Sequence, residues 1–432
     1  MDTIDIEVAL ASKSVVMSEN CLTALVEKYL LARKIRPNTI ITEFDYEEGS
    51  SSSLKTLVHY VSIGNTNENS PFIDLHSYKI NWNIFMLQNE KSTIYDESDQ
   101  GGEEIVLATH LTLPSKELFS LWENLYYDSN IKDDLLRYAR TMMTFANKTI
   151  NPNIVCCNKV ILLHGPPGTG KTSLCKALAQ KLTITMKDLF SSGLLVEINS
   201  HSLFSRYFSE SGKLVTKMFT KIKEMCQNEK TLICVLMDEV ESLAHARSLC
   251  SDNEPSDSIR VVNSILTQID QIKLMPNVLI FATSNMTETI DVAFVDRADI
   301  KQFLGLPSMI AIYKIYYSCL MELIRAKIIN CDPNSLDTPD MIARGVDLSN
   351  NTHEYSKRLM EICHQSSGFS GRTLRKIPFL AHALYVRSEN LPVRMDTFLN
   401  SMEAAVEREH KDKKLITIKP EKHNTVSGNK FS

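Results

Sequence analysis

The hydrophobic pattern of the first hundred residues is typical of a small mixed domain. Apolar residues recur at helical spacing over 22–30, and two later segments, 57–63 and 80–86, have the composition and alternation of strands. Between the first two of these, 47–53 is rich in glutamate, glycine and serine, which predicts a loop. We therefore expect an α+β domain over residues 1–100.

The chain then becomes polar and acidic and loses its apolar periodicity. A Gly-Gly-Glu-Glu sequence at 101–104 ends this stretch, so we predict a linker over 101–115. Helical spacing returns over 118–145, and the polar residues at 128–130 predict a break between two helical segments.

From residue 160 onwards, apolar runs alternate with segments of helical periodicity. The run 232–237 is apolar without interruption, which is typical of a central strand buried on both faces. Regular alternation of strand and helix predicts a parallel, doubly wound sheet of the α/β class. The predicted strands are 160–163, 194–198, 232–237 and 278–282, and the predicted helices are 173–182, 214–225 and 262–272.

Strand patterns stop near Leu306-Pro307, and helical patterns continue to about His410. This change predicts a small, all-helical domain. The last twenty residues are polar and are predicted to be disordered. The expected division is therefore an N-terminal domain over 1–100, a linker over 101–115, a large α/β domain over 116–305, a small helical domain over 306–412 and a tail over 413–432.

Composition narrows the class of protein only slightly. The 432 residues are 43% hydrophobic and 23% charged, as in an ordinary soluble protein of two or three domains. A net charge of −5 argues against a large nucleic-acid surface, and the absence of 18 consecutive apolar residues argues against a membrane span. The ten cysteines form no C-x-x-C pair and the N-terminus has no signal pattern, so we expect a cytosolic or nuclear protein without a structural zinc site.

A glycine-rich segment joins the strand at 160–163 to the helix after it and fits the phosphate-binding pattern G-x-x-x-x-G-K-[ST]. Its glycines would let backbone N–H groups and the helix N-terminus surround anionic oxygens. Lys171 would place a positive charge on the β- and γ-phosphates, and the Thr172 hydroxyl would bind Mg²⁺. The alternative is a glycine-rich turn that binds nothing. The nine residues from His164 to Thr172, which contain the pattern and lie between a strand and a helix, argue against it. The segment comprises Gly165, Pro166, Pro167, Gly168, Thr169, Gly170, Lys171 and Thr172.

Carboxylates follow the apolar run 232–237, and the carboxyl ends of strands form the ligand edge of such a sheet. Asp238 would bind Mg²⁺ through water, and Glu239 would act as general base on the water that attacks the γ-phosphate. Asn285, after the next strand, would orient that water, although a simple strand-to-loop turn explains Thr283-Ser284-Asn285 equally well.

Charge that develops during phosphoryl transfer also needs a cation, which is usually an arginine. Arg297 is the candidate. The alternative is that Arg297 only forms a salt bridge with Asp296 or Asp299.

These motifs resemble those of the AAA+ ATPases, specifically the AAA branch with its second region of homology, over about residues 116–412. The resemblance implies a large ATPase domain with a small helical lid, a homohexameric ring, and ATP with Mg²⁺ bound at each subunit interface. It implies that Arg297 reaches the γ-phosphate in the neighbouring subunit, although many members carry two arginines here and this chain has one. It also implies that Arg372, which follows Gly371 at the start of a helix, contacts the nucleotide of its own subunit.

The segment 204–211 resembles the first pore loop of the same family. The resemblance implies that Tyr207 and Phe208 project into the central channel and grip peptide, with Ser209 where glycine is usual. The alternative is that both aromatic side chains belong to the core, as aromatic residues commonly do. Their polar neighbours favour the pore loop.

Longer sequence words are similar to those of the pachytene checkpoint ATPase family. This resemblance implies remodelling of HORMA-domain proteins of the spindle checkpoint and meiotic chromosome axes, directly or through a HORMA-like adaptor, in the nucleus and cytoplasm. It also implies that the N-terminal domain engages the substrate or adaptor, although residues 1–100 contain no matching word. The matching words lie at 198–204, 208–219, 254–257, 259–263, 297–302, 371–372 and 378–385.

Three other functions remain open at this point. The chain could be an AAA+ unfoldase with a different client, a nucleic-acid motor, or a nucleotide-dependent scaffold without turnover. The acidic balance disfavours the nucleic-acid motor. The intact set of Lys171, Asp238, Glu239 and Arg297 disfavours the scaffold. Neither a membrane nor direct nucleic-acid contact is expected.

Overall fold

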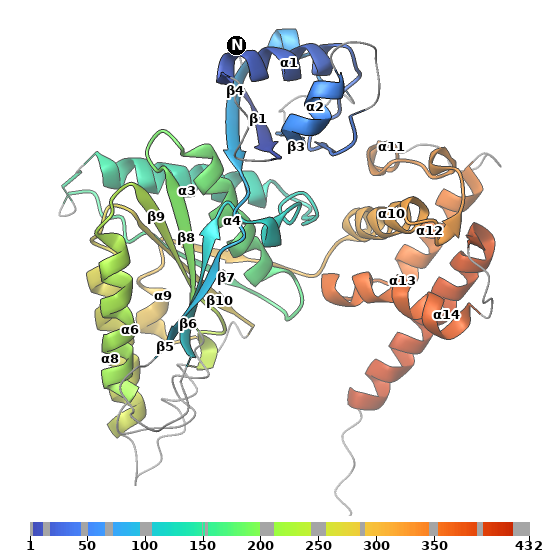
Figure 1. The fold of residues 1–432 in the computed structure, drawn as a ribbon. Helices are drawn as coiled ribbons and strands as arrows, with labels where there is room; N and C mark the ends of the chain where they lie inside the picture. Colours follow the sequence, from blue (N-terminus) through green and yellow to red (C-terminus); the bar gives the residue numbers. More distant parts are fainter. Residues whose placement is uncertain are drawn as a thin grey trace, which may run out of the picture. The chain divides into compact units, whose positions relative to one another are not determined.

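The chain divides into two compact units, Met1–Leu306 and Pro307–Ser432. Figure 1 shows the computed structural model from which both are described. The structure describes residues 3–11, 18–44, 51–64, 72–95, 106–148, 150–151, 154–198, 211–242, 256–285, 290–344, 353–386 and 392–417.

The first unit begins with a four-stranded sheet in the order β2-β3-β1-β4, in which β1 pairs antiparallel with β3 and parallel with β4. Alternate residues of β1, including Ile4, Ile6 and Val8, are buried against the helices. The sequence pattern did not predict this central strand, and the loop predicted to extend to residue 53 is wrong from residue 51 onwards because a helix begins there. The elements are β1 (Thr3–Leu10), α1 (Glu19–Leu31), β2 (Ile40–Ile41), α2 (Ser51–Leu57), β3 (Val58–Ile63), a 3₁₀ helix (Leu75–Ser77) and β4 (Lys79–Met86).

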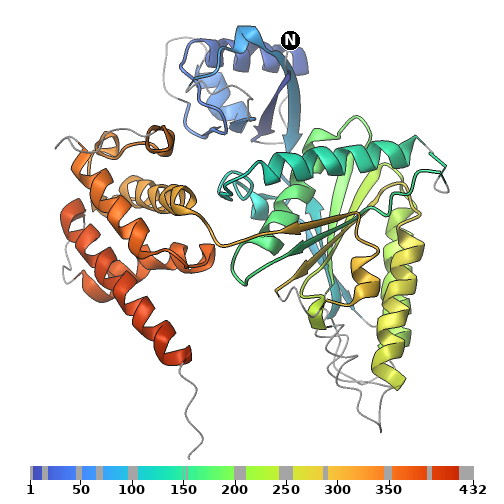
Figure 2. The same ribbon diagram turned by 180° about the vertical axis from the view of Figure 1, so that it is seen from behind.

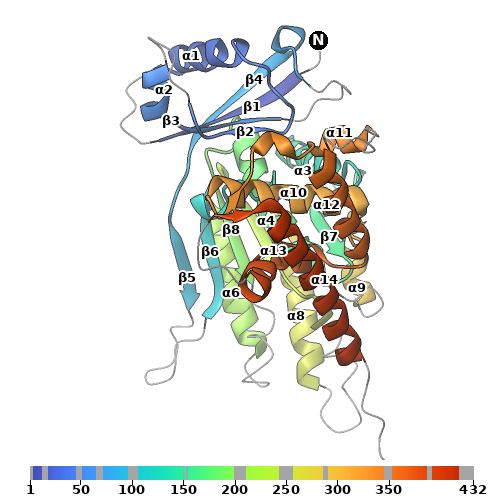
Figure 3. The ribbon, with the colours of Figure 1, turned by 90° about the vertical axis from the view of Figure 1, so that its right-hand side faces the viewer.

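The rest of the unit is built on a seven-stranded sheet in the order β11-β7-β10-β9-β8-β6-β5. The five strands from β11 to β8 are parallel, while β6 and β5 add antiparallel at one edge (Figure 3). This confirms the predicted α/β sheet and places β10 between β7 and β9. The strands are β5 (Lys91–Tyr95), β6 (Val106–Leu113), β7 (Val160–His164), β8 (Ser192–Ile198), β9 (Thr231–Met237), β10 (Val278–Ser284) and β11 (Ile300–Phe303).

The predicted linker over 101–115 is wrong from residue 106 onwards, because 106–113 form β6. Leu111 and Leu113 are buried while Thr112 between them is partly exposed, so the strand is amphipathic and its polar half resembles a linker. The first of the two helical segments predicted over 118–145 is also wrong. The chain there forms a 3₁₀ helix, Lys116–Leu118, and turns, and the helix α3 begins only at Ile131 and ends at Asn147.

Helices cover both faces of the large sheet (Figures 1 and 2). One apolar cluster joins α3 and α4 to one face, and a second joins α6, α8 and α9 to the other. Every residue of β9 and β10 is consequently buried, which is the physical reason for their uninterrupted apolar pattern. The helices are α4 (Lys171–Thr185), α6 (Ser211–Cys226), α8 (Ser256–Ile272) and α9 (Val292–Val295).

The second unit is mainly helical, as predicted, around the fully buried Tyr313 and Tyr316. Two short strands pair within it, so strands do not stop completely at residue 306. The predicted tail over 413–432 is wrong for 413–417, which are helical, and its remainder lies outside the described residues. The elements are α10 (Met309–Arg325), β12 (Ile329–Asn330), a 3₁₀ helix (Pro333–Ser335), α11 (Pro339–Ala343), α12 (Glu354–Gln365), α13 (Gly371–Tyr385), β13 (Val393–Arg394) and α14 (Met395–Thr417).

Among the helices in the described part of the chain, none combines the length and the apolar character that a bilayer crossing requires.

Candidate functional site

The predicted nucleotide residues of the first unit meet at the carboxyl ends of three adjacent strands. Lys171 follows β7, Asp238 follows β9 and Asn285 follows β10, which lies between the other two. The N–H of Gly165 donates to the carbonyl of Ser284 at 3.2 Å, which joins the start of the glycine-rich loop to the end of β10. The strand order therefore gathers groups that are far apart in the chain.

Two glycines of the loop have backbone conformations and neighbours that exclude a side chain. Gly165 has a φ of +141°, and a Cβ atom there would lie 2.2 Å from the carbonyl oxygen of Leu304. Gly170 has a φ of +91°, and its Cβ would lie 2.9 Å from the hydroxyl of Tyr127. A side chain at either position would collide with these neighbouring atoms, so the loop requires glycine there.

The lysine of the loop lies inside it. The Lys171 ammonium donates to the carbonyl oxygens of Gly165 at 2.9 Å and Pro166 at 2.8 Å, and the residue is buried. The hydroxyl of Thr169 also donates to Pro166, at 3.0 Å. These bonds hold a positive charge beside the N-terminus of α4, where backbone N–H groups and the helix dipole favour anions.

The oxygen atoms of Thr172 and Asp238 lie together although 66 residues separate them. The Thr172 hydroxyl donates to the two carboxylate oxygens of Asp238 at 2.9 and 3.1 Å, and the Thr283 hydroxyl donates to the same carboxylate. Hydroxyl and carboxylate oxygens are the donors that Mg²⁺ prefers, and protein sites commonly supply one or two of them beside substrate phosphates and water. The donor set therefore fits Mg²⁺.

Glu239 lies next to Asn285 at the same edge of the sheet. The Asn285 side-chain amide donates to the Glu239 carboxylate at 3.4 Å, and the Glu239 N–H donates to the Thr283 hydroxyl at 3.3 Å. Glu239 has a φ of +57°, a left-handed conformation that is strained for a residue with a side chain. Such strain commonly occurs at functional positions, where it aims a side chain that regular backbone would not.

Two residues at the site were not assigned a role from the sequence. Thr283 contacts both Asp238 and the backbone of Glu239, and its only sequence signal was a polar residue ending an apolar strand. Tyr127 donates at 3.4 Å towards the carbonyls of Thr169 and Gly170, and no local pattern predicts that contact.

The histidine that precedes the loop is electrically neutral at pH 7. Burial and, secondly, the nearby Lys171 ammonium lower the pKa of His164 below its ordinary value. Its ring packs against that of Phe303 with 5.5 Å between centroids. His164 therefore adds no positive charge to the loop.

Arg297 forms its salt bridge with Asp270, so the predicted alternative partners Asp296 and Asp299 are wrong. Its guanidinium approaches the Asp270 carboxylate to 2.7 Å, and it donates to the carbonyl of Ala293 at 2.6 Å. The Asp299 carboxylate instead accepts the backbone N–H of Asn158 at 3.0 Å.

The remaining predicted site residues belong to the second unit or lie outside the described residues. Arg372 is an exposed residue in the first turn of α13, in the second unit. Ser370 caps that helix, because its hydroxyl accepts the N–H of Thr373. Tyr207 and Phe208 lie outside the described residues, so their pore-loop role stays a prediction, as does the role of Arg372.

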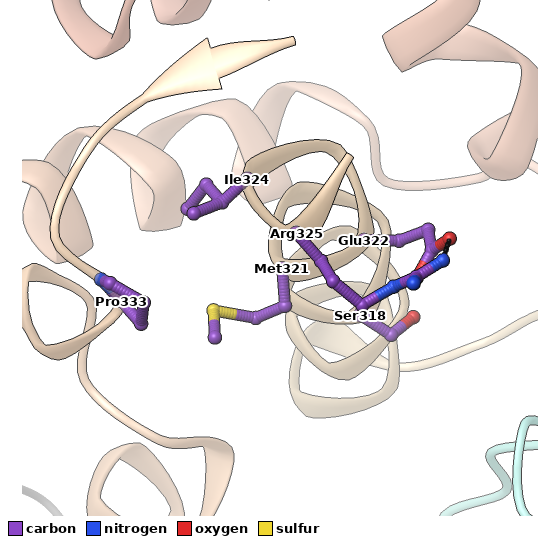
Figure 4. A pocket seen from close by; sticks show the side chains of 6 residues that line it. All are labelled: Ser318, Met321, Glu322, Ile324, Arg325 and Pro333. Carbon is purple, nitrogen blue, oxygen red and sulfur yellow. Dashed lines mark hydrogen bonds and ion pairs between the residues drawn. The ribbon is translucent and has the colours of Figure 1, made fainter. Parts of the chain in front are cut away.

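The second unit also has a groove along α10, shown in Figure 4. Met321 and Ile324 line it together with Pro333, while Glu322 and Arg325 bond to each other at 2.6 and 2.9 Å. The groove is also lined by Ser318, whose hydroxyl donates to the carbonyl of Ile315 at 2.8 Å, and its only carboxylate, Glu322, is bonded to Arg325. The chemistry is therefore assigned to the strand ends of the first unit.

The glycine-rich loop, its buried lysine and the carboxylates at the strand ends together form the site of a P-loop nucleoside triphosphatase. Comparison with protein families places the chain in the AAA class. Residues 161–306 match the ATPase family associated with various cellular activities (AAA), and residues 308–410 match the TRIP13-like, AAA+ ATPase lid C-terminal domain. The chain is thus an ATPase that binds nucleotide through its AAA domain.

Whole-chain relatives identify the family more narrowly. Pachytene checkpoint protein 2 homologs of Homo sapiens and Xenopus tropicalis are each 48% identical to this chain over 90% of both sequences. The solved structure of C. elegans PCH-2 matches with a TM-score of 0.74 at 33% identity, covering 95% of this chain and 100% of that one. The chain belongs to the pachytene checkpoint protein 2 family.

A more distant solved structure shares the fold. A chain of the E. coli MS115-1 HORMA:CdnC:Trip13 complex matches with a TM-score of 0.51 at 16% identity, covering 69% of this chain and 94% of that one.

Proposed function

We propose that this chain assembles as a homohexamer that hydrolyses ATP with Mg²⁺ and uses the energy to remodel HORMA-domain proteins, directly or through a HORMA-like adaptor. The observation that supports the chemistry is the pairing of Thr172 with Asp238 and of Asn285 with Glu239 beside the glycine-rich loop. The choice of client follows from membership of the family and from the HORMA protein in the more distant bacterial complex.

The loop from Gly165 to Thr172 would bind the phosphate chain through its backbone N–H groups, with the Lys171 ammonium on the β- and γ-phosphates. Thr172 and, through water, Asp238 would hold Mg²⁺, which neutralises charge on the phosphate oxygens when bound. Thr283 would keep the Asp238 carboxylate in place through its hydroxyl.

Hydrolysis needs a water molecule aligned with the γ-phosphorus. Glu239 would accept a proton from that water while the water oxygen bonds to the γ-phosphorus. The bond between the γ-phosphorus and the β,γ-bridging oxygen would break, and ADP would leave. Asn285 lies within hydrogen-bonding distance of Glu239 and would orient the same water. Arg297 would enter from the neighbouring subunit to stabilise the transition state, and Arg372 would contact the nucleotide from its own subunit.

A trapping experiment tests hydrolysis and client together. Glu239→Gln keeps the side-chain shape but removes the base, so it should bind ATP, fail to hydrolyse it and retain a HORMA-domain protein from the same organism in a pull-down. Lys171→Ala is the control, because it should retain nothing in ATP. Wild-type turnover by Glu239→Gln would contradict the site assignment.

The same experiment separates the leading alternative. A hydrolysis-blocked ring that retains ATP but captures no HORMA-domain protein would leave an AAA ATPase with a different client. From the same choice of client we also propose a location at chromosomes and kinetochores in the nucleus, and in the cytoplasm. That proposal would fail together with the client.

A further inference from the structure

The side chain of Arg297 is fixed by two neighbouring elements. Asp270 lies in the last turn of α8, and its carboxylate accepts the Arg297 Nε–H at 3.1 and 3.2 Å and an Nη2–H at 2.7 Å. The carbonyl of Ala293, in α9, accepts an Nη1–H at 2.6 Å. The guanidinium is therefore held along one edge and at one tip.

This arrangement leaves part of the guanidinium available for a further anion. A guanidinium has five N–H donors. One N–H on each terminal nitrogen of Arg297 has no hydrogen-bond partner among the residues that the structure describes. Because the group is planar, a carboxylate on one edge fixes the direction of the donors that remain.

Asp270 and the helix α8 that carries it are themselves held firmly in place. Ile265, Ile269 and Ile272 of α8 are buried against the large sheet. The Asp270 carboxylate also accepts the Lys273 ammonium at 2.8 Å, and that ammonium reaches Asn158 at 3.1 Å. Burial alone would raise the pKa of Asp270, but hydrogen bonds from Arg297 and Lys273 lower it, so the carboxylate stays ionised at neutral pH.

We propose that Asp270 is a positioning residue for hydrolysis: it holds Arg297 by one edge so that the remaining donors face the γ-phosphate bound by the neighbouring subunit. The inference rests on the proposed function, in which Arg297 acts across the subunit interface. An arginine side chain loses rotamer freedom when it binds an anion. Because Asp270 already orders Arg297 within one subunit, that conformational entropy is lost before the interface with the neighbouring subunit forms.

Two other roles for the pair make different predictions. A latch that withholds Arg297 from the neighbour would make Asp270→Asn faster than the wild-type protein. A purely structural ion pair between α8 and α9 would make Asp270→Asn less stable, with any loss of hydrolysis confined to the altered subunit's own site.

The test compares Asp270→Asn and Arg297→Ala by steady-state ATP hydrolysis and thermal melting. Asp270→Asn is expected to lower kcat roughly 10- to 100-fold, as misplacement of a catalytic group does, with KM for ATP and the melting temperature unchanged. The double variant should be no slower than Arg297→Ala, because Asp270 acts through Arg297. Asp134→Asn, which removes an exposed partner of Arg137, is the matched control and should hydrolyse ATP normally.

Mixed rings locate the defect. Rings co-expressed from Asp270→Asn and Lys171→Ala subunits carrying different tags should exceed the summed rates of the separate variants, because some interfaces join an intact loop to an intact pair of Arg297 and Asp270. Recovery with Arg297→Ala but not with Asp270→Asn would overturn the positioning role, as would full or increased activity of Asp270→Asn alone. Normal hydrolysis by Arg297→Ala, or mixed rings of Arg297→Ala that never recover, would instead contradict the proposed function of Arg297.

Discussion

At the scale of single residues, the nucleotide site depends on one charged side chain and on a backbone position where no side chain fits. Lys171 is a buried cation held by two loop carbonyls, and its ammonium is the only side-chain charge of the loop itself. Gly165 has to be a glycine, because its backbone passes directly beside the carbonyl of Leu304 and leaves no room for a Cβ atom. The two kinds of contribution predict different consequences of mutation.

Lys171→Ala should lose ATP binding. Removing one partner of a desolvated charge pair costs about 2–5 kcal/mol, so affinity should fall at least roughly 30-fold. Lys176→Ala is the matched control on the same helix, because Lys176 pairs with Glu197 at 2.6 Å and not with the loop. Fluorescent nucleotide titration of both variants decides the matter, and equal affinities would contradict the assignment of Lys171.

Gly165→Ala should destabilise the protein itself. The added Cβ would overlap the Leu304 carbonyl in a backbone conformation that alanine rarely adopts, at a cost on the order of 3 kcal/mol. Thermal melting without nucleotide measures this cost. A Gly368→Ala variant separates the two causes, because its φ of +84° is equally left-handed but its Cβ would meet no atom within 4 Å. Equal melting temperatures for the two variants would show that the close contact is unimportant.

At the scale of elements, α4 connects the nucleotide loop to the N-terminal sheet. Its first residue is Lys171, and Lys181 further along donates to Glu7 of β1 at 2.8 Å and to Glu123 at 3.1 Å. Ser62 of β3 donates to the same Glu123 carboxylate at 3.1 Å. Burial alone would lower the pKa of Lys181, but the two carboxylates raise it above its ordinary value, so the ammonium persists at neutral pH.

Lys181→Met should therefore be strongly destabilising. It leaves the buried Glu7 carboxylate and the half-buried Glu123 carboxylate without their cation, and breaking a buried ion pair costs about 3–5 kcal/mol. Arg137→Met is the comparison, because its pair with Asp134 is exposed and should contribute at most about 1 kcal/mol. Chemical denaturation of both variants measures the difference. Similar unfolding free energies for the two variants would mean that the ion-pair network around Lys181 does not contribute to stability.

At the scale of the whole molecule, the protein consists of two units that meet in sequence between Leu306 and Pro307. The assembled chemistry of the site lies in the first unit, while Arg372 belongs to the second. Tyr207 and Phe208, which lie outside the described residues, carry the predicted mechanical contact with a client. ATP hydrolysis and mechanical work are therefore expected to be separable by mutation.

Tyr207→Ala should leave folding, ring assembly and basal ATPase activity near normal while abolishing remodelling of a HORMA-domain client. An aromatic side chain in a pore offers a broad contact surface at low entropy cost, which suits many peptide sequences. If Tyr207 were a core residue, the same change would cost about 3–5 kcal/mol and reduce every activity together. Melting temperature, basal hydrolysis and client conversion on one preparation distinguish the two, and a proportional loss of all three would exclude the pore loop.

The sequence by itself determined the parts of this protein that have a local or periodic signature. The nucleotide loop is a contiguous pattern, so Lys171 and Thr172 could be assigned before any fold was known. Asp238 and Glu239 could be assigned because they follow an uninterrupted apolar run. Such a run marks a central strand, since a strand covered by helices on both faces must be apolar throughout. The same argument predicted the α/β class and the helical second unit.

Only the tertiary structure decided the contacts between polar residues that are far apart in the chain. Lys181 meets Glu7 across 174 residues, Thr283 meets Asp238 across 45, and Arg297 meets Asp270 across 27. The physical reason is that a polar residue has the same local sequence signature whether it is solvated or paired. Burial gives apolar side chains a period of 2 or 3.6 residues, whereas a hydrogen bond between distant residues leaves no period at all. The sequence pattern did not predict β6, which lies between β8 and β5, for a related reason: its half-solvated face has the composition of a linker.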